Sequence, residues 1–258
     1  MIWKKSLQNI PEGLELNKEI MKVDILAIGA HPDDIELSAA GTIMQQISLG
    51  KKVAIVDLTE GELGSRGTIE TRYAEAADAS EIMGVSKRVN LNLGDGFFDF
   101  SKANKLKIIE QIRFFQPEIV LVNAYSDRHP DHGKGATLAK EACFLSGLVK
   151  IETEMDGVAQ AKWRPKAVYG YIQDHYLKPD FVVDITPFIE RKLEAIQAYK
   201  TQFFNPKSTE PNTPISSKEF LDFLKGRWSE FGRSIGTQYG EGFTVDRPIG
   251  IKDISDLL

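Results

Sequence analysis

The sequence of 258 residues contains one cysteine and four histidines, and it lacks long apolar runs. A lone cysteine cannot form an internal disulfide, so we expect a reducing compartment and a cytoplasmic protein. Cys143 has apolar neighbours in a helix-like stretch, which indicates a core residue rather than a catalytic thiol. No run approaches the roughly 18 apolar residues of a membrane span, and none resembles a signal peptide, so no membrane partner is expected.

The sequence also lacks a dominant charge of one sign. Lys and Arg total 32 and Asp and Glu total 37, which gives a formal net charge of -5, and the two signs are interspersed. Because there is no basic stripe, we expect no nucleic-acid partner. The length and the hydrophobic content of 42% suit one large globular domain. We expect residues 1–21 to form a peripheral extension and residues 22–258 to form a single domain.

What the sequence does contain is a regular alternation of apolar runs and amphipathic stretches. This alternation predicts βαβ units, and therefore a Rossmann-like, mostly parallel sheet flanked by helices, with a C-terminal extension that completes the pocket. Strands are expected at 23–29, 52–58, 89–93, 119–123, 167–172 and 181–185. Helices are expected at 35–49, 69–83, 103–115, 133–148, 187–199 and 216–231. Residues 203–214 should form a loop and 240–243 a coil that folds back.

Polar residues gather in two short motifs, each directly after an apolar run. The segment AHPDDI occupies residues 30–35, and HPDH occupies residues 129–132. In open parallel sheets, ligands bind beyond the carboxyl ends of the strands, so both motifs are expected at one edge. Any one of these histidines alone would be interpreted as a loop residue. Three of the four histidines, together with three aspartates, predict a metal site.

His31, Asp34 and His132 are the predicted metal ligands. His31 and Asp34 are three residues apart where strand turns into helix, a spacing that lets both side chains reach one point. His132 is expected in the loop after the strand at 119–123. Two imidazoles and one carboxylate leave room for water, and such open sites are catalytic. Zn²⁺ is the expected cofactor, and Fe²⁺ accepts the same ligands.

The same motifs hold three candidate catalytic residues. Asp33 is not expected to bind the metal, so it is suited to take a proton from the attacking water. His129 precedes His132 by three residues and could donate a hydrogen bond to an oxyanion or a proton to a leaving amine. Asp131 could orient that imidazole and favour its cationic form.

The segment AHPDDIE at residues 30–36 resembles the signature of the PIG-L/LmbE family of zinc-dependent N-deacetylases. The HPDH segment resembles the second motif of that family, and the resemblance covers roughly residues 22–245. It implies hydrolysis of the N-acetyl group of an N-acetylglucosamine conjugate. It also implies that His31, Asp34 and His132 bind zinc, that Asp33 is the general base, that His129 is the electrophilic histidine and that Asp131 is its partner.

A narrower resemblance points to the bacillithiol-pathway deacetylases, which remove acetyl from N-acetylglucosaminyl malate. It rests on TEGELGSRGT at residues 59–68, on Arg128, and on SIGTQYGEGF at residues 234–243. By this resemblance we expect a small amino-sugar substrate and a homo-oligomer, since members of the family are often hexameric.

Four residues are candidate substrate-binding groups. The two carboxylates of malate favour guanidinium partners, which Arg66 and Arg128 could supply. A solvated loop arginine is the alternative for Arg66, and pairing with Asp127 is the alternative for Arg128. Asp95 follows the third strand and could bind a sugar hydroxyl, and Tyr239 could close the pocket.

Alternatives from other classes remain open. Two histidines and a carboxylate also form the facial triad of non-haem iron oxygenases, although the parallel α/β pattern and the spare Asp33 disfavour that chemistry. A sugar-binding module that has lost activity would not need an intact base. A deacetylase acting on another amino-sugar conjugate is the strongest alternative. His175 is interpreted as a surface-loop residue.

Overall fold

The computed structural model describes residues 20–256, so the extension expected at residues 1–21 lies almost wholly outside the described part. The main sheet has seven strands in the order β3-β2-β1-β4-β7-β9-β8. These strands are β1 (Ile25–Gly29), β2 (Val53–Asp57), β3 (Lys87–Asn90), β4 (Ile119–Val122), β7 (Ala167–Tyr171), β8 (Phe181–Asp184) and β9 (Gly240–Val245). The helices are α1 (Asp34–Ser48), α2 (Ile69–Met83), α3 (Lys102–Phe115), α4 (Pro130–Leu145), α5 (Ile189–Gln197) and α6 (Lys218–Ser234). A small hairpin joins β5 (Glu154–Met155) to β6 (Val158–Ala159).

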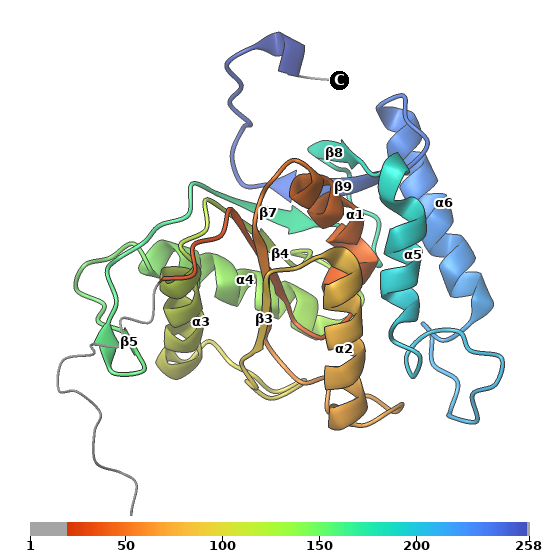
Figure 1. Ribbon diagram of the computed structural model, residues 1–258, viewed down its shortest axis with the longest axis horizontal. Coiled ribbons are helices and arrows are strands. Elements are labelled where there is room, and N and C mark those ends of the chain that lie inside the picture. The colour runs from red at the N-terminus through yellow and green to blue at the C-terminus, as the bar shows by residue number, and fades with distance from the viewer. Residues whose placement is uncertain (1–19, 257–258) are drawn as a thin grey trace, which may run out of the picture.

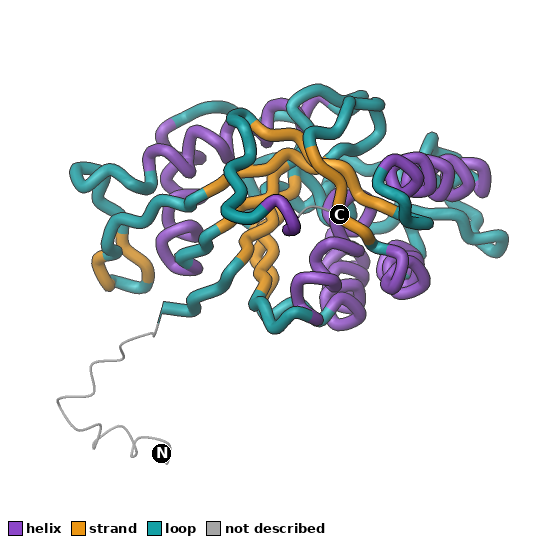
Figure 2. The backbone as a smooth tube through the Cα atoms, turned by 90° about the horizontal axis from the view of Figure 1, so that it is seen from above, coloured by secondary structure: helices purple, strands orange, loops and turns teal. Residues whose placement is uncertain are grey.

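The predicted α/β architecture is confirmed. Strands β3, β2, β1, β4 and β7 run parallel, while β9 pairs antiparallel with both β7 and β8. Helices α3 and α4 cover one face of this sheet, and α1, α2, α5 and α6 lie on the other side (Figure 1). The view from above shows strands between helices on both sides (Figure 2).

The expected coil at 240–243 is wrong, because this segment is part of strand β9. Its two glycines explain why a strand fits there. A Cβ atom on Gly240 would lie 2.9 Å from the backbone nitrogen of Gly232, and one on Gly242 would lie 3.0 Å from the Phe231 ring. Glycine in a strand interior often marks such a close approach, which lets α6 pack directly against β9.

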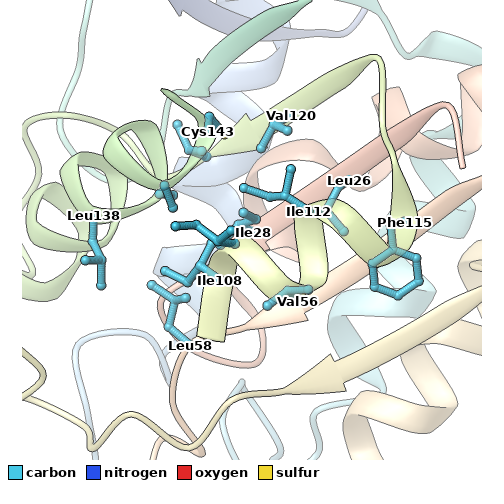
Figure 3. Close-up of a cluster of buried hydrophobic side chains, with 14 of the residues drawn as sticks. Leu26, Ile28, Val56, Leu58, Ile108, Ile112, Phe115, Val120, Leu138 and Cys143 are labelled. Carbon is cyan, nitrogen blue, oxygen red and sulfur yellow. The ribbon is translucent and has the colours of Figure 1, made fainter. Parts of the chain in front are cut away.

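Alternate residues along the parallel strands fill two separate hydrophobic clusters. One cluster packs the strands against α3 and α4 and includes Leu26, Val56, Ile112 and Cys143 (Figure 3). Burial raises the pKa of the Cys143 thiol to about 12, which fits a core residue. None of the helices within residues 20–256 is long and apolar enough to span a membrane.

Helix α4 begins at Pro130, three residues earlier than expected. Proline is suited to the first helical position, and the His129 ring caps the helix by accepting the backbone N–H of Asp131. His132 therefore lies in the first turn of α4 and not in the preceding loop. The direction of a side chain is more restricted in a helical turn than in a loop.

Candidate active site

The structure brings the three predicted ligands together at the carboxyl edge of the parallel strands. His31 follows β1, Asp34 begins α1, and His132 lies in the first turn of α4. Asp34 Oδ1 lies 3.0 Å from His132 Nε2, and Asp34 Oδ2 lies 3.7 Å from His31 Nδ1. One carboxylate thus lies between two imidazole rings whose centroids are 5.6 Å apart.

A carboxylate also contacts the far nitrogen of each ring. His31 Nε2 lies 3.0 Å from Asp95 Oδ1, and His132 Nδ1 lies 2.5 Å from Asp127 Oδ2. Metal-binding histidines almost always use their second nitrogen in this way, because the partner fixes the tautomer and direction of the ring. The donor set therefore fits a divalent cation held by His31 Nδ1, Asp34 and His132 Nε2.

The electrostatics of the two rings agree with this fit. Burial by itself lowers the pKa of His132, but Asp34 and Asp127 outweigh it and raise the pKa to about 9. Burial also lowers the pKa of His31, but Asp131, Asp95 and Asp34 outweigh it and raise the pKa to about 10. The surroundings of both rings thus favour positive charge, which a divalent cation supplies.

Within residues 20–256, two groups of three residues have candidate ligand atoms that all lie within 4.8 Å of one another; both include His31 and neither includes Asp34. One group adds His129 and His132, and the other adds Asp95 and Asp131. In the first, His129 Nδ1 accepts a backbone N–H, so His129 could offer a cation only its Nε2. In the second, the two carboxylates face the Nε2 side of His31, so this set does not include His132 as a ligand. The arrangement around Asp34 uses both rings.

Asp33 and Asp34 are neighbours with different partners. Asp33 has a φ of 117°, and its carboxylate accepts a hydrogen bond from Arg72 Nη1 at 3.0 Å. Arg72 Nη1 also donates to the backbone oxygen of Pro32. Burial raises the pKa of Asp33 to about 6 although Arg72 lowers it. A strained, buried carboxylate with a raised pKa beside the proposed ligands fits a general base.

His129 lies in the same cluster, with its ring centroid 4.6 Å from that of His31 and 5.2 Å from that of His132. Burial, followed by the positive charges of His31 and His132, lowers its pKa. Because Nδ1 accepts the Asp131 backbone N–H, we assign the proton of the neutral ring to Nε2. The neutral ring can therefore donate a hydrogen bond to substrate.

Asp131 differs from its predicted role. Its carboxylate accepts from the Gly96 backbone at 2.7 Å and from Lys134 Nζ at 3.1 Å, and it lies 3.5 Å from His31 Nε2. The first turn of α4 directs this side chain toward the 94–96 loop. The backbone of Asp131, and not its carboxylate, is what contacts the His129 ring.

The structure gives two of the candidate substrate residues other partners. Arg66 is buried and donates to Ser208 Oγ at 2.8 Å and to the Pro211 oxygen, so it fixes the 203–214 loop. Tyr239 packs against the hydrophobic cluster that joins α2, α5 and α6. Among the described residues, neither side chain forms a hydrogen bond or ion pair with the proposed ligands.

The other two candidates lie close to the proposed ligands. Asp95 binds His31 and also accepts the Leu63 backbone N–H, so its carboxylate orients a ring instead of facing a sugar. Arg128 is half exposed and pairs with Asp174 at 2.5 Å, not with Asp127. His175 is exposed, as expected, but its backbone N–H donates to Asp127.

Sequence reasoning missed four residues of the site: Arg72, Asn123, Asp127 and Gln173. Asn123 and Gln173 follow the neighbouring parallel strands β4 and β7, a position that could have signalled them. Both reach the Asp34 carboxylate, at 2.9 and 3.1 Å. Arg72 lies in the first turn of α2 directly after the 59–68 loop, and only the tertiary structure shows its contact with Asp33.

The fold and these side chains define an α/β protein with a histidine–aspartate centre, suited to a divalent cation, at the carboxyl edge of its parallel strands. Comparison with known proteins identifies the family. A family model described as GlcNAc-PI de-N-acetylase (PIG-L) matches residues 26–143. A diacetylchitobiose deacetylase of Thermococcus kodakarensis is 30% identical over 229 residues, covering 84% of this chain and 81% of the relative. The chain belongs to the PIG-L family of deacetylases.

Two further similarities support the assignment. The crystal structure of the conserved protein TT1542 from Thermus thermophilus has a TM-score of 0.79 and 31% identity, covering 90% of this chain and 98% of that one. A probable N-acetyl-alpha-D-glucosaminyl L-malate deacetylase of Bacillus anthracis is 24% identical, covering 69% of this chain and 81% of the relative.

Proposed function

We propose that the protein is a metal-dependent N-deacetylase that hydrolyses the acetamide of an N-acetylglucosamine conjugate and releases acetate and a free amine. The observation that carries this proposal is the division of labour between adjacent aspartates. Asp34 lies between two imidazole rings, each of which is oriented by another carboxylate. Asp33 is not placed as a metal ligand, and its pKa is raised. A hydrolase needs this additional base, whereas an iron oxygenase with the same ligands does not.

His31, Asp34 and His132 would hold the cation, and zinc is our first choice because two imidazoles and a carboxylate with an open position suit it. A bound divalent cation supplies Lewis-acid polarisation of the acetyl carbonyl and of the attacking water. Asp33 accepts the proton of that water, and its pKa near 6 leaves it ionised at neutral pH. His129 Nε2–H donates a hydrogen bond to the developing oxyanion.

Proton transfer to the leaving nitrogen completes the reaction. The proton that Asp33 has accepted passes to the amine as the C–N bond breaks, which restores the carboxylate. Arg72 pairs with Asp33 and holds it in this place throughout. Burial of these groups excludes bulk water, which strengthens each electrostatic contact.

For the substrate we propose N-acetylglucosaminyl malate or a closely related acidic conjugate. Arg128 supports this choice, because its guanidinium is half exposed, it immediately precedes His129, and within residues 20–256 its ion-pair partner is Asp174. A malate carboxylate can replace Asp174 in a forked contact. The relative described as a probable N-acetylglucosaminyl-malate deacetylase supports the same substrate class.

The test measures acetate release from N-acetylglucosaminides with malate, neutral and basic aglycones. We expect hydrolysis of the malate conjugate to be fastest. Asp33→Asn should bind metal as the wild type does and lose most turnover, and asparagine tolerates the positive φ at this position. Near-normal turnover of Asp33→Asn would refute the base assignment, and equal rates on neutral aglycones would refute the substrate assignment.

A further inference from the structure

Residues 173–175, which lie shortly after strand β7, contact Asp34 and the partner of His132. Gln173 is 8% exposed, and its side chain lies beside Asp34. The backbone of His175 lies beside Asp127, the carboxylate behind His132. One short segment therefore reaches the metal centre from two directions.

The orientation of the Gln173 amide is fixed by a backbone donor. Its Oε1 accepts the N–H of Ala124 at 3.1 Å and the side-chain amide of Asn123 at 3.0 Å. A backbone N–H can only donate, so the oxygen must be on that side and Nε2 must be on the other. Nε2 then donates to Asp34 Oδ1 at 3.1 Å.

The two oxygens of Asp34 have different surroundings. Oδ2 accepts the His31 backbone N–H at 3.0 Å and the Asn123 amide at 2.9 Å, so both of its lone-pair directions are used. Oδ1 accepts from Gln173 and lies 3.0 Å from His132 Nε2. Oδ1 is therefore the oxygen directed to the cation, and Gln173 sets its direction.

The same segment acts on His132 through Asp127. The His175 backbone N–H donates to Asp127 Oδ1 at 2.6 Å, and Asp127 Oδ2 contacts His132 Nδ1 at 2.5 Å. Movement of this backbone would change the direction of Asp127 and, with it, that of the His132 ring.

Arg227 of α6 holds the segment by its carbonyl oxygens. Its guanidinium donates to the backbone oxygens of Gln173 and Asp174, each at 3.0 Å, and more weakly to that of His175 at 3.4 Å. The rings of Tyr176 and Phe223 lie 5.5 and 5.1 Å from the guanidinium and fix its plane. The planar guanidinium fork suits carbonyl oxygens that lie side by side.

We propose that Gln173 and Arg227 are positioning residues for the metal centre: Arg227 fixes the 173–175 backbone, and that segment directs Asp34 through the Gln173 amide and His132 through Asp127. This inference rests on the proposed function, because it assumes that His31, Asp34 and His132 hold the cation. Residues that orient metal ligands typically change metal affinity about 10- to 100-fold when replaced.

The experiment compares five proteins: wild type, Gln173→Met, Arg227→Met, His132→Ala and the control Arg233→Met. Arg233 is an exposed arginine in the last turn of α6, the same helix as Arg227. Zn²⁺ affinity is measured by chelator competition, and ligand geometry by the visible absorption of the Co²⁺-loaded protein. Circular dichroism and thermal unfolding of the metal-free proteins establish that each variant is folded.

We expect Gln173→Met to weaken Zn²⁺ binding about 10- to 100-fold and Arg227→Met about 10-fold, both with an altered Co²⁺ spectrum. Arg233→Met should match the wild type. If folded Gln173→Met keeps wild-type affinity and spectrum, the positioning role is overturned, and this variant decides the matter if Arg227→Met does not fold. If the wild type binds no metal, or His132→Ala binds it as tightly, the proposed metal centre itself is wrong.

Discussion

Replacing Arg128 should change substrate selectivity without changing the chemistry. The guanidinium is half exposed and its Nε pairs with Asp174, whose side chain is also partly exposed. In the proposed binding mode, a malate carboxylate displaces Asp174 from Arg128. The energetic effect of Arg128 on substrate binding is therefore a difference between two carboxylate contacts, and it is smaller than the energy of either contact.

The magnitude follows from the exposure of the pair. A charge-assisted contact at a half-exposed site contributes about 1.5 kcal/mol, the lower end of the range for charged hydrogen bonds. The displaced surface pair contributes about 0.5 kcal/mol. The net of about 1 kcal/mol predicts that Arg128→Met lowers kcat/KM for the malate conjugate about 5-fold. Asp174→Asn removes the competitor and should raise the same quantity about 2-fold.

The assay is the initial rate of acetate release from the malate conjugate and from its neutral methyl glycoside, at low and at high salt. The neutral substrate should be hydrolysed equally by all three proteins, and the effects on the malate conjugate should shrink as salt increases. If Arg128→Met lowers the hydrolysis rates of both substrates by the same factor, this residue supports the loop and does not bind the aglycone. An unchanged rate ratio in Asp174→Asn would refute the displacement argument.

Three other predictions concern the ion pair behind the site, the thiol and the cation. Lys192→Met should destabilise the fold by about 3–5 kcal/mol in denaturant unfolding, because it leaves Glu241 buried without its partner, and adding Glu241→Gln should recover part of that loss. Cys143 should react with a thiol reagent roughly 1000-fold more slowly in the folded protein than in denaturant, since burial raises its pKa from 9.0 to about 12. Because the pKa of the Cys143 thiol is higher in the folded than in the unfolded protein, the stability that this thiol contributes should be complete below pH 9 and decline between pH 9 and 12. Removal of the cation by a chelator at pH 7 should abolish acetate release, while the circular dichroism spectrum remains that of a folded protein. If the protein unfolds instead, the site is a structural metal site and not an open catalytic one.

The alternating pattern predicted the parallel part of the sheet because its central strands β1, β2 and β4 are almost fully buried and read as nearly continuous apolar runs. Strand β9 could not be found in that way. Its residues, GEGFTV, contain two glycines whose role is to admit α6, and that close contact exists only in the tertiary structure. The start of α4 was missed for a different reason, since the capping side chain is a histidine, which is not among the usual N-cap residues.

The motifs predicted that His31, Asp34 and His132 lie together, and they do, because all three lie where strands end and their directions follow from the adjoining helix turns. Arg66 shows the limit of that argument. Its loop lies on the correct rim, yet its side chain turns toward the 203–214 loop, while Arg72, four residues into α2, turns toward Asp33. Position in the sequence gives the edge of the sheet on which a residue lies, and it does not give the direction of a long side chain.

Charge balance explains why so many aspartates lie around two imidazoles. With both rings neutral, the carboxylates near them outnumber the nearby cationic groups Arg72 and Lys134, and the buried site carries an excess of negative charge. The raised pKa values of His31 and His132 are the response of the metal-free site, because protons on both rings supply two positive charges. A divalent cation supplies the same charge from a position between the rings, so it can replace the two protons without changing the net charge of the site. The carboxylates concerned are those of Asp33, Asp34, Asp95, Asp127 and Asp131.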